Sequence, residues 1–266
     1  MAGAVPEGQG GMAALIGMDD QAVIDLCASV SGERISEAVN FNAPGQVAIS
    51  GHLDALEKTG ANFTIMNGYL EGRLADEEGA DMLLKSARET AQIGKRLGVD
   101  RLNLHGTGLG DGGIPIPLHG TFAPGMELRA RDTLHRICDM AEEEGVTFTL
   151  ENLNPLDHPG CPFGSTQAVL SLVSAVNRPQ LKINLDLYHT QIGEGDLIRW
   201  CEACQPWIGE VQVADNPGRC EPGTGEINYP NVFAAIDKAG YNGWIGCEYA
   251  PAGTTEEGLG WMQPYR

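Results

Sequence analysis

The chain has 266 residues, of which 42% are hydrophobic and 20% are charged, and this is enough for one large globular domain or two modest ones. Its formal net charge of −19 at pH 7 argues against nucleic acid and anionic membrane as partners, because both require a basic surface. A small molecule or a metal cation fits this charge better.

The amino-terminal stretch MAGAVPEGQGG carries no Lys or Arg, and no window of the chain reaches the roughly 18 apolar residues that a membrane span needs. We therefore expect a cytoplasmic protein. Seven scattered cysteines are an odd number and predict reduced thiols over a disulfide framework. Cys201 and Cys204 form the one CxxC, but no second pair completes a zinc site, so packing within a helix is the favoured role.

The first 60 residues are predicted to follow a β-α-β-β-α order. Strands are expected in GGMAALIGM, ISEAVNF and QVAISG, and helices in DDQAVIDLCASV and HLDALEK. The hairpin through FNAPGQ predicts an antiparallel pair, in contrast to the parallel pattern that follows it. We therefore expect a domain boundary near residue 60, which divides the chain into 1–60 and 61–266.

From residue 61 onward, apolar runs of strand length alternate with amphipathic segments of helix length, which is typical of βαβ units and a parallel sheet. About six such units are present. The strands are predicted near 61–66, 100–105, 146–151, 181–187, 208–213 and 243–248. The helices are predicted near 79–97, 126–144, 165–176, 194–204, 229–239 and 254–262.

Four of these strands end in a polar side chain on one face. Because neighbouring side chains of a strand point to opposite faces, Asp186 faces away from the apolar Ile183 and Leu185 of its strand. The same alternation sets Glu151, Gln212 and Glu248 on polar faces. A doubly wound sheet would be apolar on both sides, whereas a barrel that opens into an active site would bring these four residues together at the carboxyl ends of its strands.

These four side chains supply hard oxygen donors, the set that Mg²⁺ or Mn²⁺ prefers. Three carboxylates crowded together would also repel one another without a cation. For any one residue alone, an ordinary hydrogen-bonded or surface carboxylate is the favoured interpretation. Four of them on successive strands, at about the spacing of a βα unit, favour a site.

Other polar residues are candidates for the same cleft. His189 follows Asp186 by three residues, and we expect it to contact substrate. Arg219 lies in the loop VQVADNPGRCEPGTGEINY, and the sequence leaves open whether it binds a substrate carboxylate or hydroxyl or pairs with acidic neighbours. His105 either lines the cleft or is a satisfied core histidine. Glu226 is interpreted as a carboxylate that fixes the loop.

Two sequence motifs give weaker evidence about function. The segment GLGDGG at 108–113 satisfies GxGxxG, but IPIPLHGTFAP follows where the helix of a phosphate-binding site would begin. We therefore expect a flexible loop over the site. The chain contains no GxSxG, the strongest signal for a serine acyl-enzyme.

Five segments carry a family resemblance: LENLNP, LDLYHTQIGEGDL, VQVADNPGRCEPGTGEINYP, GYNGWIGCEY and TTEEGLGWMQPYR. Through them, residues from about 61 to 266 resemble hydroxypyruvate isomerase and its relatives among the xylose-isomerase-like TIM barrels, which include the ketose 3-epimerases. The epimerase relatives have His where Gln212 stands. The resemblance implies an isomerase that converts hydroxypyruvate to 2-hydroxy-3-oxopropanoate with a divalent metal, Mg²⁺ or Mn²⁺.

The resemblance also implies the roles of individual residues. It implies metal ligands at Glu151, Asp186, Gln212 and Glu248, with the two glutamates as the catalytic acid and base. It implies substrate contacts at His189 and Arg219.

Residues from about 3 to 58 resemble a different protein, the small ferredoxin-like subdomain of malonyl-CoA:acyl carrier protein transacylase, through AVPEGQGGMAALIGMDD and AVNFNAPGQVAISGH. The nucleophilic Ser and catalytic His of that family lie outside this subdomain and have no counterpart here. Together the two resemblances predict a chimeric chain, in which a small α+β segment precedes an incomplete (β/α)8 barrel that lacks its first two βα units.

An incomplete barrel exposes sheet edges. Residues 11–60 either fill the gap or form a separate lobe that borrows the strand at 61–66, in which case we expect a homo-oligomer. The separate lobe is slightly favoured. The alternative to an isomerase is a catalytically inactive fusion that acts as an oligomeric or binding module, with a transacylase remnant as a more distant third.

Overall fold

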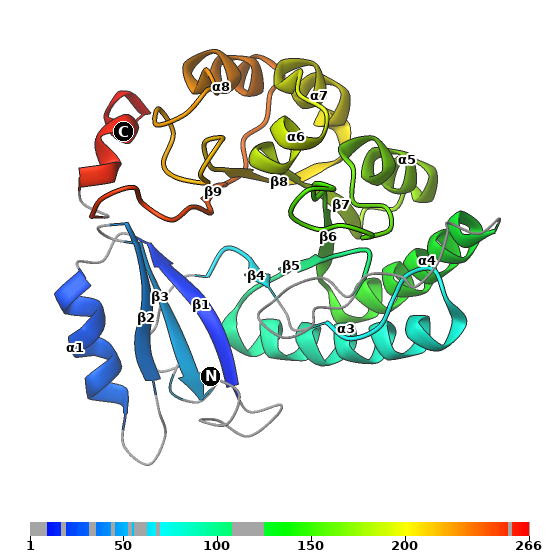
Figure 1. Ribbon diagram of the computed structural model, residues 1–266. Coiled ribbons are helices and arrows are strands. Elements are labelled where there is room, and N and C mark those ends of the chain that lie inside the picture. The colour runs from blue at the N-terminus through cyan, green and yellow to red at the C-terminus, as the bar shows by residue number, and fades with distance from the viewer. Residues whose placement is uncertain are drawn as a thin grey trace.

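The computed structural model describes residues 10–16, 20–31, 36–43, 46–52, 55, 63–67, 70–107, 125–254 and 257–265. The strands within these ranges form two sheets, one of three antiparallel strands and one of six parallel strands (Figure 1). None of the helices in these ranges is long and apolar enough to cross a membrane.

The smaller sheet contains β1 (Gly10–Ile16), β2 (Ser36–Ala43) and β3 (Gln46–His52), with α1 (Asp20–Val30) between β1 and β2. Its strand order is β1-β3-β2, and β3 is antiparallel to both neighbours. The predicted hairpin of antiparallel strands is therefore confirmed. A β-α-β unit with a third strand inserted between its strands is a split β-α-β unit. Most of the helix predicted in HLDALEK lies outside the described residues.

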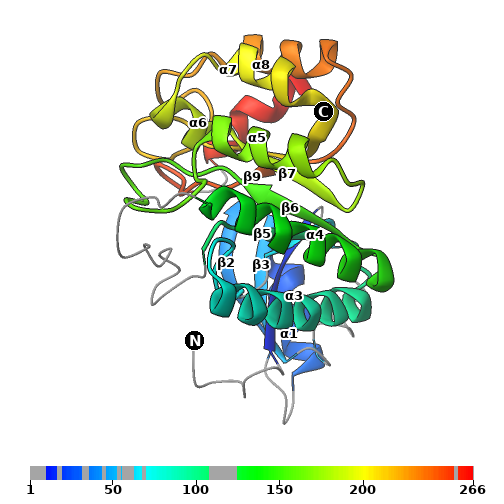
Figure 2. The ribbon, with the colours of Figure 1, turned by 90° about the vertical axis from the view of Figure 1, so that its right-hand side faces the viewer.

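The larger sheet has the order β4-β5-β6-β7-β8-β9, and each strand is parallel to its neighbours. It curves into part of a barrel, as predicted, with the helices that connect the strands on its outer side (Figure 2). Its strands are β4 (Met66–Asn67), β5 (Arg101–Leu104), β6 (Thr147–Glu151), β7 (Leu181–Asp186), β8 (Ile208–Val213) and β9 (Ile245–Cys247). The helices are α3 (Glu77–Leu97), α4 (Met126–Glu144), α5 (Thr166–Val176), α6 (Leu187–Gly193), α7 (Leu197–Cys204) and α8 (Tyr229–Lys238), with the 3-10 helices η2 (Gln205–Trp207) and η3 (Glu257–Tyr265).

Helix α3 illustrates how local sequence sets these elements. The Asp76 side chain accepts a hydrogen bond from the Gly79 amide at 2.5 Å and caps the amino terminus. Gly98, with φ +72°, ends the helix in the left-handed conformation that glycine adopts without strain. The face containing Leu83 and Ala87 is buried, so the helix is fixed by its caps and by one apolar stripe.

Several predicted boundaries differ from the structure. The strand predicted at 61–66 is only Met66–Asn67, an edge strand with β5 as its one neighbour, and residues 61–62 lie outside the described part of the chain. The helix predicted at 194–204 begins at Leu197, because Gly195 and Asp196 have φ values of +65° and +52°. The carboxy-terminal helix predicted at 254–262 is the 3-10 helix Glu257–Tyr265.

The three strands of the smaller sheet do not join the six-stranded sheet, so they do not fill the barrel with parallel strands. Within the described residues, β4 pairs with β5 and with no strand of the smaller sheet, which contradicts a lobe that borrows this strand. Val23 and Cys27 of α1 belong to the same buried apolar cluster as the barrel strands. The domain division at residue 60 stays a prediction.

Two faces of the parallel sheet differ in chemistry. The outer face is buried under helices and is apolar, as with Phe148 and Leu150 of β6. The inner face is buried too, but its side chains are polar: Asn103, Thr149, Glu151, Asn184, Asp186, Glu210 and Gln212. The alternation predicted from the sequence is confirmed for β6, β7 and β8. The same alternation holds at the edge strand β9, where Gly246 faces Glu210 and Gln212, but Ile245 on the opposite face is 37% exposed.

Candidate active site

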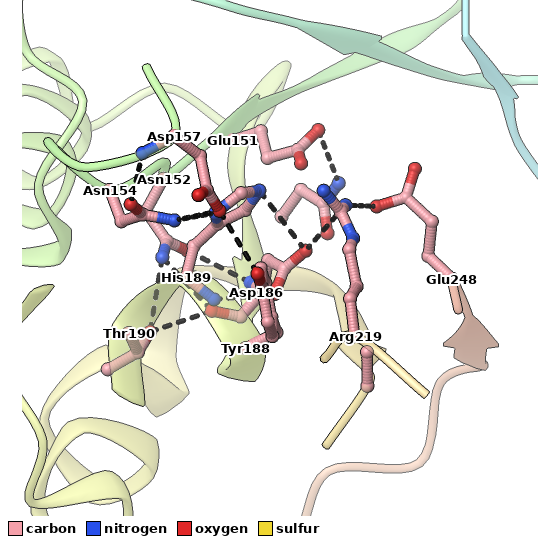
Figure 3. Close-up of polar contacts among 12 residues, drawn as sticks. Glu151, Asn152, Asn154, Asp157, Asp186, Tyr188, His189, Thr190, Arg219 and Glu248 are labelled. Atoms are coloured by element: carbon pink, nitrogen blue, oxygen red, sulfur yellow. Dashed lines mark hydrogen bonds and ion pairs between the residues drawn. The ribbon is translucent and has the colours of Figure 1, made fainter. Parts of the chain in front are cut away.

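The carboxyl ends of β6 and β7 bring three side chains together. One donor atom from each of Glu151, Asp186 and His189 lies within 4.8 Å of the others, and all three residues are buried (Figure 3). Glu151 is the last residue of β6 and Asp186 is the last residue of β7, while His189 lies in the first turn of α6. Parallel strands end at the same edge of a sheet, which explains why Glu151 and Asp186, 35 positions apart in sequence, meet here.

Glu151 is fixed by side chains from both neighbouring strands. Its Oε2 atom accepts hydrogen bonds from Asn103 on β5 and from Asn184 on β7, the latter at 3.3 Å. His105 Nε2 lies 3.1 Å from the same oxygen. Burial alone would raise the pKa of Glu151, but the hydrogen bond and charge of His105 outweigh burial and lower it. The same contact raises the pKa of His105 against the effect of its own burial.

Asp186 caps α6 and thereby orients His189. Its Oδ1 atom accepts the His189 backbone N–H at 3.0 Å, and its Oδ2 atom lies 3.8 Å from His189 Nε2. The pKa of Asp186 is raised well above its ordinary value by burial and by the charges of Glu248 and Glu151. A positive charge added beside Asp186 would therefore stabilise its ionised form.

A loop after β6 fixes the other ring nitrogen of His189. Asn154 Nδ2 lies 2.7 Å from His189 Nδ1, and the same amide donates to Asp157 Oδ2 at 2.9 Å. Since an amide nitrogen can only donate, Nδ1 accepts and the neutral ring carries its proton on Nε2. Burial lowers the pKa of His189 to about 4, so the ring is neutral near pH 7. The Tyr188 hydroxyl donates to Asp157 at 3.1 Å and completes the network.

Arg219 connects the β7 side of the site to the β9 side. Its Nη2 atom lies 2.5 Å from Glu248 Oε2 and 3.9 Å from Asp186 Oδ2 (Figure 3). Its guanidinium also stacks over the Tyr188 ring, 5.0 Å from the centroid. The pairing with acidic neighbours that the sequence left open is therefore present. Burial and the charge of Glu151 raise the pKa of Glu248, while Arg219 opposes them.

The loop that carries Arg219 is tied down by buried Asp215. Its carboxylate accepts the backbone N–H groups of Asn216, Gly223 and Ile227 at 2.9, 2.7 and 3.1 Å. This holds Arg219 at φ +53°, a conformation that bulky residues rarely adopt. Glu226 accepts hydrogen bonds from Gln191 and Asn216 at 3.1 and 2.8 Å, so its predicted role in fixing the loop is confirmed.

Gln212 lies beside Asp186 in register, but its side chain makes no hydrogen bond to the residues described above. Its Oε1 atom is buried and has no hydrogen-bond partner among the described residues. An unpaired acceptor beside Asp186, whose pKa is raised by burial and by the charges of Glu248 and Glu151, fits an oxygen-liganded cation. Glu151, Asp186 and the unpaired Gln212 oxygen fit a divalent cation, whereas Glu248, the fourth predicted ligand, lies outside the cluster of Glu151, Asp186 and His189 and pairs with Arg219.

Sequence reasoning missed part of this site. Asn103 obeys the same alternation in RLNLH as the predicted residues and could have been found by it, whereas His105, for which two roles were left open, lines the site beside Glu151. Asn154, Asp157 and Tyr188 lie outside the strands and show no periodic signal. Glu210 is also buried on the inner face, where burial and the charge of Glu151 raise its pKa to about 8.

Two further predictions concern the cysteines and the loop at 108–113. All seven cysteines are free thiols, as expected, and Cys201 and Cys204 are buried in α7. The loop predicted at 108–113 lies outside the described residues.

The fold and the site define a parallel β/α barrel protein with an acidic, polar centre at the carboxyl ends of its strands. The family model for the xylose isomerase-like TIM barrel matches residues 41–265. The chain therefore belongs to the xylose isomerase-like TIM barrel family.

Curated relatives match over part of their length. The hydroxypyruvate isomerase of Escherichia coli K12 is 44% identical over 135 residues, which cover 51% of this chain and 52% of that protein. A 2-oxo-tetronate isomerase of Pectobacterium atrosepticum is 40% identical over 134 residues, which cover 50% of this chain and 51% of the relative. The chain thus spans about half the length of these relatives.

A crystal structure described as AP endonuclease, family 2, from Brucella melitensis superposes with a TM-score of 0.69 at 30% identity, covering 80% of this chain and 82% of that one. The 3-keto-D-glucoside 4-epimerase of E. coli gives a TM-score of 0.66 at 21% identity, over 80% of this chain and 82% of the other, and supports the fold alone.

Proposed function

We propose that the protein is an isomerase that interconverts a small 2-oxo acid and its hydroxy-aldehyde isomer, such as hydroxypyruvate and 2-hydroxy-3-oxopropanoate. The two most similar relatives named above are isomerases of small oxo acids, which supports this substrate class. The observation that carries the proposal is the placement of Glu151 and Glu248 on β6 and just after β9, with Asp186 and Arg219 between them.

Glu151, Asp186, Gln212 and Glu248 are the residues proposed to hold a divalent cation, Mg²⁺ or Mn²⁺. When bound, such an ion polarises the carbonyl and adjacent hydroxyl of a substrate. A zinc atom is named in the crystal structure of the IOLI protein, which shares the fold at 20% identity with a TM-score of 0.64, over 78% of this chain and 77% of that one.

The chain's own residues supply binding and proton transfer. The Arg219 guanidinium offers donors to a substrate carboxylate or hydroxyl, and the His189 Nε2–H, fixed by Asn154, offers one more. One of the two glutamates removes the proton from the carbon next to the carbonyl, which gives an enediolate. The other glutamate returns a proton to the former carbonyl carbon, and the hydroxyl proton passes to the former carbonyl oxygen, so that the carbonyl and hydroxyl exchange places.

Isomerisation of hydroxypyruvate in deuterated solvent tests the proposal. The chelator-treated chain is loaded with Mg²⁺ or Mn²⁺, and deuterium incorporation into substrate and product is followed by NMR. We expect turnover and exchange in the wild type and loss of both in Glu248→Gln. Glu202→Gln, an exposed carboxylate on α7, is the matched control. Undiminished exchange in Glu248→Gln would rule out the two-glutamate mechanism.

The open edge of the sheet favours a second candidate, a catalytically inactive oligomeric or binding module. Among the described strands, β9 has β8 as its one neighbour, and Trp244 beside it is 55% exposed. Metal binding without turnover of hydroxypyruvate, together with a homo-oligomer in light scattering, would favour this candidate over the isomerase. An acyl-transfer assay run beside them tests the transacylase remnant.

We place either function in the cytoplasm, because seven free thiols are typical of a reducing compartment.

A further inference from the structure

Three buried oxygen acceptors on the inner face of the barrel have no hydrogen-bond partner among the described residues. They are Asn184 Oδ1, Glu210 Oε2 and Gln212 Oε1, and each residue is at most 5% exposed. A buried acceptor without a donor is costly, and three together point to a missing donor or cation. Two of them, Asn184 and Glu210, belong to no part of the isomerase mechanism proposed above.

The sheet places these three residues side by side. Asn184 on β7 is the register partner of Glu210 on β8, and Gln212 follows Glu210 by two residues on the same face. Register partners have Cβ atoms about 5 Å apart, and residues two positions apart on one strand lie about 7 Å apart. The Asn184 amide nitrogen donates to Glu151, so its nitrogen is engaged and its oxygen is the atom left over.

Glycines on the flanking strands leave room for this group. A Cβ atom on Gly246 of β9 would lie 2.9 Å from Glu210 Oε1 and 3.4 Å from Gln212 Cγ. The side chains of Glu210 and Gln212 therefore both pack against the backbone of Gly246. The register between β7 and β8 shifts at Gly209, where a Cβ atom would lie 2.7 Å from Lys182 Cβ. This bulge sets Glu210 on the inner face opposite Asn184.

No cationic side chain in the described part of the chain forms an ion pair with Glu210. The Arg101 guanidinium, on the neighbouring part of the barrel, donates instead to the Gly209 carbonyl at 3.0 Å. The group therefore consists of one carboxyl group, which binds a cation in its ionised form, and two amide oxygens, all of them hard donors toward a metal.

We propose that Asn184, Glu210 and Gln212 form a second binding site for a hard divalent cation, on the β8 side of Glu151, with which Asn184 and Glu210 are level in register. Gln212 is common to both sites, since it adjoins Asp186 in register on one side and Glu210 along the strand on the other. The second site differs from the first in requiring Glu210 and neither Glu248 nor Arg219, so substitutions can remove the two sites separately.

Binding of Mn²⁺ to the full chain tests this site without an activity assay. The chelator-treated protein is titrated with Mn²⁺, and bound ions are counted by equilibrium dialysis and by electron paramagnetic resonance. We expect two ions per chain, magnetically coupled because the sites share a residue. Glu210→Gln should weaken binding of one ion by about tenfold or more and remove the coupling, since it removes the negatively charged ligand. Glu202→Gln is the matched control and should keep both ions.

Two further variants keep the test decisive if Glu210→Gln does not fold. Gly246→Ala should displace the Glu210 carboxylate and lose the same ion, and Asp186→Asn should lose the other ion while keeping the Glu210-dependent one. A single ion in the wild type, or two coupled ions that survive Glu210→Gln, would overturn the second site. A single ion that depends on Asp186 leaves the proposed function standing, whereas two bound ions without turnover overturn the proposed function alone.

Discussion

The two proposed catalytic glutamates are held in different ways. Glu151, on the inner strand β6, is 5% exposed and has polar partners from β5 and β7. The Glu248 side chain, next to the edge strand β9, is 43% exposed, and its one hydrogen-bond partner in the described part of the chain is Arg219. A strand with two neighbours can fix its site residue from both sides, whereas an edge strand depends on a loop. The proposed catalytic side chains are therefore held by fewer contacts near β9 than near β6.

The largest expected effect comes from substituting each glutamate by glutamine. If both transfer protons, turnover should fall by about 10²- to 10⁴-fold in either variant. The free energy of unfolding should distinguish the two variants. Glu151→Gln loses buried charge-assisted hydrogen bonds and should lower this free energy by about 1–3 kcal/mol, while Glu248→Gln should change it by no more than about 0.5 kcal/mol. Urea denaturation of the metal-free variants measures the difference. Equal losses of stability would show that the two sides are equally pre-organised.

Asp186 is the residue that joins the two sides, since it contacts both His189 and Arg219. Asp186→Asn keeps the cap of α6 but removes a charged oxygen donor, so Mn²⁺ affinity at this site should fall by about 100-fold. Calorimetric titration measures it, with Asp237→Asn, an exposed carboxylate of α8, as the control. Unchanged affinity would exclude Asp186 from the cation centre.

The strand residues of this site were predictable because a strand has a fixed period of two. That rule found Glu151, Asp186 and Gln212, and it extends to Asn103 and Glu210, which were not selected. The curved parallel sheet followed from the alternation of strand-length and helix-length segments.

The remaining contacts depend on the positions at which the chain turns, and no sequence periodicity marks those positions. LDLYH continues the apolar alternation of β7, so the sequence extended the strand to residue 187. In the structure Asp186 ends the strand because its side chain caps α6. That turn brings Tyr188 to the network around Asp157, a contact that the strand interpretation could not give.

The buried side of the site should make folding depend on pH. The pKa of His189 is about 4 in the folded chain against an ordinary value of 6.5, so between these values the unfolded state binds more protons. Stability is therefore fully present above pH 6.5 and is lost as the pH falls toward 4. Between pH 7 and pH 5 this histidine should account for a loss of about 2 kcal/mol.

Urea denaturation in the presence of a chelator measures this loss at each pH. His189→Gln should reduce the loss, whereas the exposed His135→Gln on α4 should leave it unchanged. The same pH dependence in wild type and His189→Gln would contradict a buried neutral ring on this side of the site.

The smallest expected effect concerns Asn154, which fixes the tautomer of His189 from the loop after β6. In Asn154→Ala the ring loses its donor at Nδ1, so its proton is no longer held on Nε2, and kcat/KM should fall by about tenfold, the equivalent of one hydrogen bond of about 1.4 kcal/mol. Nitrogen-15 chemical shifts of the ring report the tautomer directly and separate this role from simple loss of stability. Asn154→Ser, whose hydroxyl is also a donor, should restore part of the activity if the tautomer matters. If the ring keeps its proton on Nε2 in Asn154→Ala, the loop after β6 does not set the tautomer of His189. The side chains around Glu151 and Asp186 would then be positioned by the strands and not by this loop.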